Sequence, residues 1–143
     1  MRRLCLLAAS VILLLPTNSL SLRTSVQTPL FDIHQPTILA FFRPSSHAQE
    51  PDSRANDALS DFQVYLREAS APLGKAGIEV HDVYARSFQV RDGMKTTTFQ
   101  TKKIGIGYYL VSPGKKPRVE YGLMSDSDLI RVASEYFEMT IKK

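Results

Sequence analysis

A short apolar run, residues 37–42 with the sequence Thr-Ile-Leu-Ala-Phe-Phe, limits what this chain can form. The run carries no charged side chain, is rich in β-branched and aromatic residues, and is too short to make a helix of its own. A half-exposed strand alternates apolar and polar residues, whereas a strand buried on both faces is apolar throughout. We therefore predict a central strand in a sheet, with helices covering the sheet.

Length and composition limit the class of protein further. The chain has 143 residues, of which 43% are hydrophobic and 22% are charged, and its formal net charge is +4. This length leaves room for one domain and excludes a multidomain enzyme. A chain this apolar and this weakly charged buries enough surface to offset the entropy lost on folding, which excludes disorder of the whole chain.

The N-terminal residues have the pattern of a signal peptide. Arg2 and Arg3 form a positive segment, and residues 4–15 form an apolar segment that is too short to span a bilayer. Small residues at Ser19 and Ser21 have the spacing that a signal peptidase recognises, so we predict cleavage after Ser21 and export to the periplasm or the extracellular space. An uncleaved N-terminal anchor is the alternative.

The only cysteine, Cys5, lies inside this predicted signal peptide, so the exported protein is expected to contain no thiol. Removing residues 1–21 also removes two arginines and lowers the excess of basic side chains from four to two. The remaining lysine pairs are separated along the chain and do not form a basic stripe. We therefore expect neither nucleic-acid binding nor stable membrane insertion after the signal is removed.

The residues around the apolar run predict other local structures. Residues 22–36 mix polar and isolated apolar residues without a period and indicate an extended lead-in, and residues 43–51 form a polar loop bounded by proline. From Asp52 the apolar residues recur every three or four positions, which predicts a helix with Asp52 or Ser53 as its N-cap. The residues expected to end this helix are Pro72, Gly74 and Gly77.

The middle of the chain has strand-like patterns. Residues 78–91 indicate either one strand with a bulge or two short strands, because the alternation changes phase within them. Asp92-Gly93 is a turn signal, and residues 96–99 indicate an edge strand or a loop. Gly105 and Gly107 alternate within the next apolar segment, where glycine typically permits close approach of a neighbouring backbone.

The C-terminal part predicts a hairpin and a helix. Residues 104–112 and 118–121 indicate two strands joined by a Pro-Gly-Lys-Lys turn. Ser125 and Asp128 form a capping box at the start of an amphipathic helix. Asp126 and Asp128 resemble a carboxylate pair but are more simply interpreted as the negatively charged first turn of that helix.

Three segments together resemble a bacterial exported thioredoxin-like family of unassigned function. They are the strand and entry Ile-Leu-Ala-Phe-Phe-Arg-Pro at 38–44, the segment Gly-Ile-Glu-Val at 77–80, and Gly-Tyr-Tyr-Leu-Val-Ser-Pro-Gly-Lys at 107–115 before a Ser-capped helix. The resemblance implies a β-α-β unit followed by β-β-α. It also implies a three-layer α/β/α domain over residues 37–143, with a central mixed sheet and a C-terminal hairpin plus helix.

The chain departs from that family at the redox site. Thioredoxins carry Cys-x-x-Cys between the first strand and its helix, where this chain has residues 44–51 without cysteine. The Phe-Phe-x-Pro entry is similar to that of peroxiredoxins, but the peroxidatic cysteine is absent too. The position of the family's cis-proline falls near Gly107. Since the thiolate is the reacting species, we expect no thiol oxidoreductase activity and no catalytic residues.

The loop after the first strand is the expected binding site. The carboxyl end of a central strand is where open α/β sheets place their ligands, Arg43 can pair with a carboxylate, and His47 can change charge in mild acid. Arg43 in an internal salt bridge is the alternative. The predicted binding residues are Arg43, Ser45, Ser46, His47, Glu50 and Tyr108.

The predicted function is that of a non-enzymatic module that binds a protein or peptide partner. Two alternatives stay open: a small-ligand-binding protein or hydrolase that uses the loop at 43–52, and a structural subunit of an envelope assembly. His47, Glu50 and Asp52 share this loop, but their spacing matches no recurring metal site, so neither a metal nor another cofactor is expected. His81 and Asp82 are neighbours on a strand and are expected to point to opposite faces.

Overall fold

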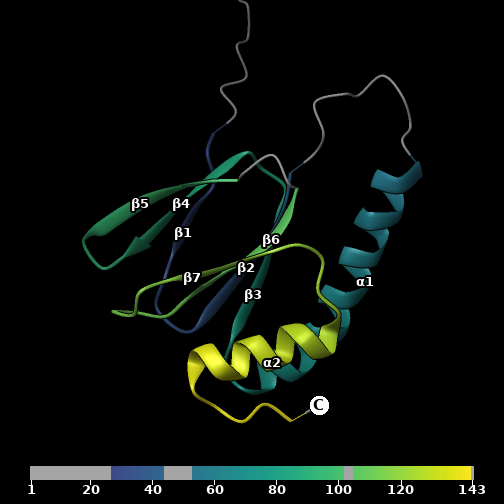
Figure 1. Ribbon diagram of the computed structural model, residues 1–143. Helices are drawn as coiled ribbons and strands as arrows, with labels where there is room; N and C mark the ends of the chain where they lie inside the picture. Colours follow the sequence, from purple (N-terminus) through teal and green to yellow (C-terminus); the bar gives the residue numbers. More distant parts are fainter. Residues whose placement is uncertain (1–26, 44–52, 102–104, 143) are drawn as a thin grey trace, which may run out of the picture.

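The structure is a computed structural model that describes residues 27–43, 53–101 and 105–142, with the side chains of the first helix described from Asn56 onward (Figure 1). The predicted signal peptide and loop residues 44–52 lie outside the described residues. In chain order the elements are β1 (Leu30–Asp32), β2 (Thr37–Phe42), α1 (Ser53–Lys75), β3 (Glu79–Val83), β4 (Ser87–Asp92), β5 (Lys95–Gln100), β6 (Ile106–Val111), β7 (Arg118–Tyr121) and α2 (Asp126–Phe137).

A four-stranded sheet in the order β3-β2-β6-β7 forms the centre of the fold. β2 runs parallel to β3 and antiparallel to β6, and β6 forms the predicted hairpin with β7. The residues from Ile38 to Phe41 are all 0% exposed. The prediction of a central strand buried on both faces is therefore confirmed, and the fold is mixed α/β.

A second sheet, in the order β1-β4-β5, contains three strands. β1 pairs in parallel with β4, and β4 and β5 form a hairpin in which Asp92 faces Lys95 across the predicted Asp-Gly turn. Residues 78–91 thus form two short strands, one of the two predicted alternatives, and the two strands belong to different sheets. Residues 96–99 lie in an edge strand, whereas β1 lies inside the predicted lead-in and extends the folded unit before Thr37.

The order of the layers differs from the expected α/β/α arrangement. Both helices pack on one face of the four-stranded sheet, where Ile38 and Ala40 contact apolar residues of α1 and α2. Leu39 and Phe41 point to the opposite face, where they pack against residues of the second sheet such as Phe88. The second sheet lies on the side of the central sheet away from the helices (Figure 1). The chain therefore buries the second face of β2 against strands, because β1 and β4 present apolar residues where a helix was expected.

The helix ends follow local sequence signals with one exception. α2 begins as predicted, because the Ser125 side chain accepts a hydrogen bond from the Asp128 N–H at 3.1 Å. α1 continues through Pro72 to Lys75, so Pro72 does not end the helix, whereas Gly77, another of the residues predicted to end it, does. Its end is formed at Gly77, which has a φ of 79°, and the Ile78 N–H donates to the Leu73 carbonyl at 3.0 Å. The left-handed conformation at Gly77 stops the helix.

Gly107 confirms the expected close approach of backbones. A Cβ atom at this position would lie 2.6 Å from the Glu120 carbonyl oxygen of β7 and would also overlap the Phe41 ring. Only glycine therefore fits between the neighbouring strand and the aromatic core without a shift.

Candidate binding site at the carboxyl ends of β2 and β3

The carboxyl ends of the parallel strands β2 and β3 lie at the same edge of the central sheet. Phe41 of β2 is paired with Val83 of β3, so Arg43 and Tyr84 follow the two strands at this edge. The ring centroids of Phe42 and Tyr84 are 6.4 Å apart. The sheet thus places Arg43, the first residue of the predicted binding loop, and the end of β3 together, at the position where open α/β sheets bind ligands.

Arg43 is held against the segment that precedes β6. Its backbone N–H donates to the Gly105 carbonyl at 2.6 Å, and its Nη1 donates to the Thr101 carbonyl at 3.3 Å. The Thr101 hydroxyl in turn donates to the Arg86 carbonyl at 2.8 Å. Among the described residues no carboxylate forms an ion pair with Arg43, so a carbonyl takes the place of the internal salt bridge that was the alternative prediction.

A cavity of about 370 Å³ opens between α1 and β3, next to the carboxyl ends of β2 and β3. Its polar wall includes Gln63, whose Nε2 donates to the Tyr84 hydroxyl at 3.2 Å. Arg67 and Asp82 are exposed and have no ion-pair partner within the described part of the chain. The lining residues are Gln63, Leu66, Arg67, Ser70, Val80, Asp82 and Tyr84.

β3 is an edge strand of the described sheet, because β2 is its only neighbour. Val80 and Asp82 face the cavity and α1, whereas His81 faces the second sheet, where its ring lies 5.6 Å from that of Phe31. The prediction that His81 and Asp82 point to opposite faces is therefore confirmed. An exposed strand edge beside a cavity offers both backbone hydrogen-bond groups and a place for side chains.

Tyr108 belongs to the core instead of a binding surface. Its side chain is 1% exposed on the helix-covered face of the sheet, and its hydroxyl accepts a hydrogen bond from the Met124 N–H at 3.3 Å. Burial raises the pKa of Tyr108, and the Met124 N–H partly opposes this effect. Both faces of β6 are covered, so strand alternation leaves neither Tyr108 nor Tyr109 on the surface.

The other predicted site residues, Ser45, Ser46, His47 and Glu50, lie outside the described residues. Asp128 lies in the first turn of α2, as predicted, and its N–H is capped by Ser125. Within residues 27–43, 53–101 and 105–142, no group of three or more His, Cys, Asp or Glu side chains is placed to hold a metal ion. In the same ranges neither helix is apolar enough over a sufficient length to cross a membrane.

The sequence analysis did not predict the residues of α1 and β3 that line the cavity between these two elements. A signal for them existed, because Gln63 and Arg67 are four positions apart on a helix and Val80, Asp82 and Tyr84 alternate along a strand. These patterns show which residues share a face of each element, but not that the two faces meet.

We compared the chain with protein-family models, with curated proteins and with solved structures, and none of the three comparisons gave a match.

Proposed function

We propose that this protein is an exported, redox-inactive, thioredoxin-like module that binds another protein or a peptide. The order β2-α1-β3 followed by β6-β7-α2, with all four strands in one mixed sheet, supports the thioredoxin-like part. Residues 44–51, which follow β2 and precede α1 in the sequence, contain no cysteine, and this supports the redox-inactive part. The charge and hydropathy pattern of residues 1–21 supports export.

The observation that carries the binding proposal is the free edge of β3 beside the cavity that it shares with α1. An extended peptide can add to such an edge as a further strand, with backbone hydrogen bonds for affinity and side-chain pockets for specificity. Alternate side chains of the added strand would enter the cavity against Leu66 and Val80. Arg67 and Asp82 would meet polar or charged side chains of the same peptide.

The register of β3 identifies the backbone groups that would bind. The Glu79 N–H donates to the Pro36 carbonyl at 2.9 Å, on the side of β2. Backbone N–H groups alternate between the two edges of a strand, so those of Val80 and Asp82 point away from β2. Proline at position 82 would remove one outward N–H while leaving the pairing of β3 with β2, and proline is tolerated at such positions of edge strands.

The test is a selection of displayed peptides on the immobilised full chain, followed by affinity measurements on two variants. Asp82→Pro removes the side-chain charge and the outward N–H, whereas the matched control Asp82→Asn removes only the charge. We expect selected peptides to bind the Asp82→Asn variant within a few-fold of the original chain. We expect binding to Asp82→Pro to be weaker by about tenfold or more, the equivalent of about 1.4 kcal/mol.

Thermal melting of both variants shows whether the fold is retained. Peptides that bind Asp82→Pro as tightly as Asp82→Asn would contradict strand addition at β3, and a selection that enriches no peptide would contradict peptide binding altogether.

A further inference from the structure

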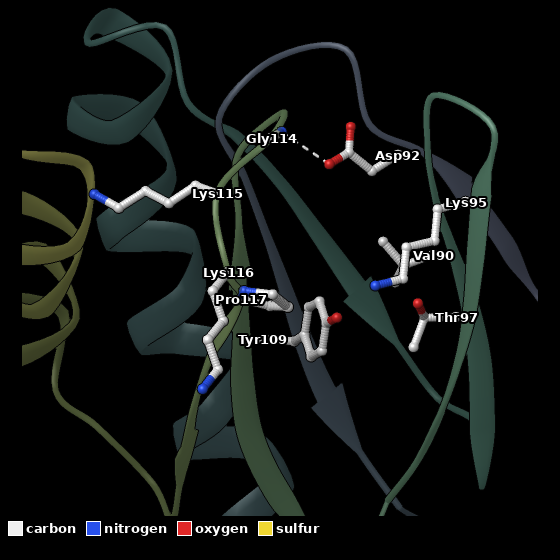
Figure 2. Close-up of a pocket in the computed structure, with 9 residues that line it drawn as sticks. All are labelled: Val90, Asp92, Lys95, Thr97, Tyr109, Gly114, Lys115, Lys116 and Pro117. Carbon is white, nitrogen blue, oxygen red and sulfur yellow. Dashed lines mark hydrogen bonds between the residues drawn. The ribbon is translucent and has the colours of Figure 1, made fainter.

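A second cavity, of about 350 Å³, lies at the other end of the molecule from Arg43. The pairing of Thr37 with Val111 places the β6–β7 turn beside the start of β2, whereas Arg43 follows the end of β2. The cavity lies between this turn and the β4–β5 hairpin and is open to solvent (Figure 2). The lining residues are Val90, Asp92, Lys95, Thr97, Tyr109, Gly114, Lys115, Lys116 and Pro117.

Tyr109 lines the base of this cavity and is 4% exposed. Its ring packs edge-on against Phe88 and Phe99, with centroid distances of 5.6 and 5.1 Å. The hydroxyl end points toward Lys95 and Thr97 (Figure 2). Burial raises the pKa of Tyr109, so the hydroxyl is protonated at neutral pH and is available as a donor.

Asp92 links the two structural elements that line the cavity, the β4–β5 hairpin and the β6–β7 turn. Its Oδ2 accepts a hydrogen bond from the Gly114 N–H at 2.8 Å, which links the β4–β5 hairpin to the β6–β7 turn (Figure 2). Asp92 faces Lys95 in the hairpin register, yet the two side chains form no ion pair. The one carboxylate of the lining thus accepts a hydrogen bond from the β6–β7 turn and forms no ion pair with Lys95.

The cavity contains positive charge that the described residues leave unpaired. The Lys115 ammonium already has partners, because its Nζ donates hydrogen bonds to the Tyr136 carbonyl at 2.5 Å and to the Glu138 carboxylate at 3.1 Å. Lys95 and Lys116 have no ion-pair partner among residues 27–43, 53–101 and 105–142. Lys95 extends over the cavity toward the Tyr109 ring, and Lys116 lies on the opposite rim (Figure 2).

We propose that this cavity binds a small organic carboxylate. The Lys95 ammonium and the hydroxyls of Thr97 and Tyr109 would hold the carboxylate, and the apolar part of the ligand would pack on Val90 and Pro117. A monoanion fits better than a dianionic phosphate, because the Asp92 carboxylate stands on the same rim. The site is separate from the cavity between α1 and β3, and it does not depend on the peptide-binding proposal.

The carboxylate could come from a free acid or from the C-terminus of a peptide, and the probes separate these sources. The full chain, labelled with nitrogen-15, is titrated in an NMR experiment with benzoate and with its neutral analogue benzamide. A second pair, N-acetylphenylalanine and its amide, mimics a peptide C-terminus. We expect one or both carboxylates to shift the amide signals around Lys95, Thr97 and Gly114, and each amide analogue to bind about tenfold more weakly or not at all.

Three variants test the assignment of the ligand groups. Lys95→Gln removes the positive charge, and Tyr109→Phe removes the hydroxyl donor while keeping the ring. Each is expected to weaken carboxylate binding by about fivefold or more. Lys142→Gln, at an exposed lysine beyond α2, removes the same charge elsewhere and is expected to leave the affinity unchanged. Thermal melting checks that the variants remain folded.

Equal binding of a carboxylate and its amide would overturn the proposal. So would an affinity of Lys95→Gln that matches that of Lys142→Gln, because binding would then depend only on total charge. Carboxylate binding at this cavity is expected to be the same whether or not a peptide binds at β3.

Discussion

Replacing Gly107 by alanine is expected to destabilise the protein through two contacts that can be separated. The new Cβ would lie 2.6 Å from the Glu120 carbonyl oxygen on β7 and would overlap the Phe41 ring. Overpacking of this kind costs roughly 1–3 kcal/mol, and the lower entropy of the unfolded alanine chain returns about 0.5–1 kcal/mol of it. The net loss thus lies between about 0 and 2.5 kcal/mol. Because the Glu120 oxygen belongs to the backbone and cannot rotate away, we expect the upper part of this range, about 1–2.5 kcal/mol, compared with the roughly 5–15 kcal/mol that stabilises a typical domain.

The contribution of the aromatic ring can be isolated with Phe41→Leu. Phe41 is 0% exposed and packs between the sheets against Phe99, with ring centroids 5.3 Å apart. Truncation of a buried phenylalanine to alanine costs roughly 3–5 kcal/mol, and leucine, which retains more of the volume, costs less. Leucine lacks the ring atoms that overlap the new Cβ but leaves the Glu120 carbonyl in place. The double variant is therefore expected to be more stable than the sum of the single effects by about 1 kcal/mol.

Urea denaturation of the original chain, both single variants and the double variant measures this coupling. The free energies of unfolding form a double-mutant cycle, and independent sites add to within about 0.3–0.5 kcal/mol. Additivity within that margin would refute the reasoning, since it would mean that the alanine methyl group does not meet the Phe41 ring.

Three further predictions concern a surface pair, the buried tyrosines and a helix cap. The Arg91 hydrogen bonds lower the pKa of Asp32, so the stability that this pair adds is present above the unfolded pKa of about 3.9 and is lost as pH falls through the folded value. The urea midpoints of the original chain and of Asp32→Asn should accordingly differ at neutral pH and converge in acid. Burial raises the pKa of Tyr108, Tyr109 and Tyr136, so their stabilising effect is complete below about pH 10 and is lost as pH rises through the folded values. An ultraviolet titration should show these tyrosines ionising late in the native protein and near pH 10 only in urea, and identical curves would contradict this. Ser125→Ala removes the cap of α2 and should cost about 1 kcal/mol in thermal denaturation, whereas Ser60→Ala, at an exposed position of α1, should cost much less.

The elements predicted correctly from sequence depend on neighbouring residues. The turn at Gly93 and the turn at Gly114 have positive φ angles of 58° and 72°, which glycine adopts without strain. The start of α2 depends on Ser125 and the residue three positions later. The buried strand at 37–42 was recognisable because burial on both faces removes every charged residue from the run itself.

The candidate site was predictable only in part. Arg43 follows a strand whose central position was evident, so its place at the carboxyl end of the sheet followed. The cavity between α1 and β3 depends instead on how α1 packs beside β3. This packing brings Gln63 within hydrogen-bond distance of Tyr84, although the two residues are 21 positions apart in the chain. The prediction of Tyr108 as a binding residue was wrong. Strand alternation shows which residues share a face of β6, but it does not show that both faces are covered by other elements.

The sequence by itself determined the central strand, the C-terminal hairpin, the Asp-Gly turn, the capped helix and the absence of cysteine after Cys5. Only the tertiary structure decided what covers the second face of the sheet. β1 has three residues and no recognisable period, and it exists because Leu30 to Asp32 pair with Gln89 to Arg91 far along the chain. Such a strand is stabilised by hydrogen bonds to β4 and by burial of its neighbour Ile33, which is 3% exposed. These are long-range contacts, and the local pattern of residues 22–36 carries no record of them.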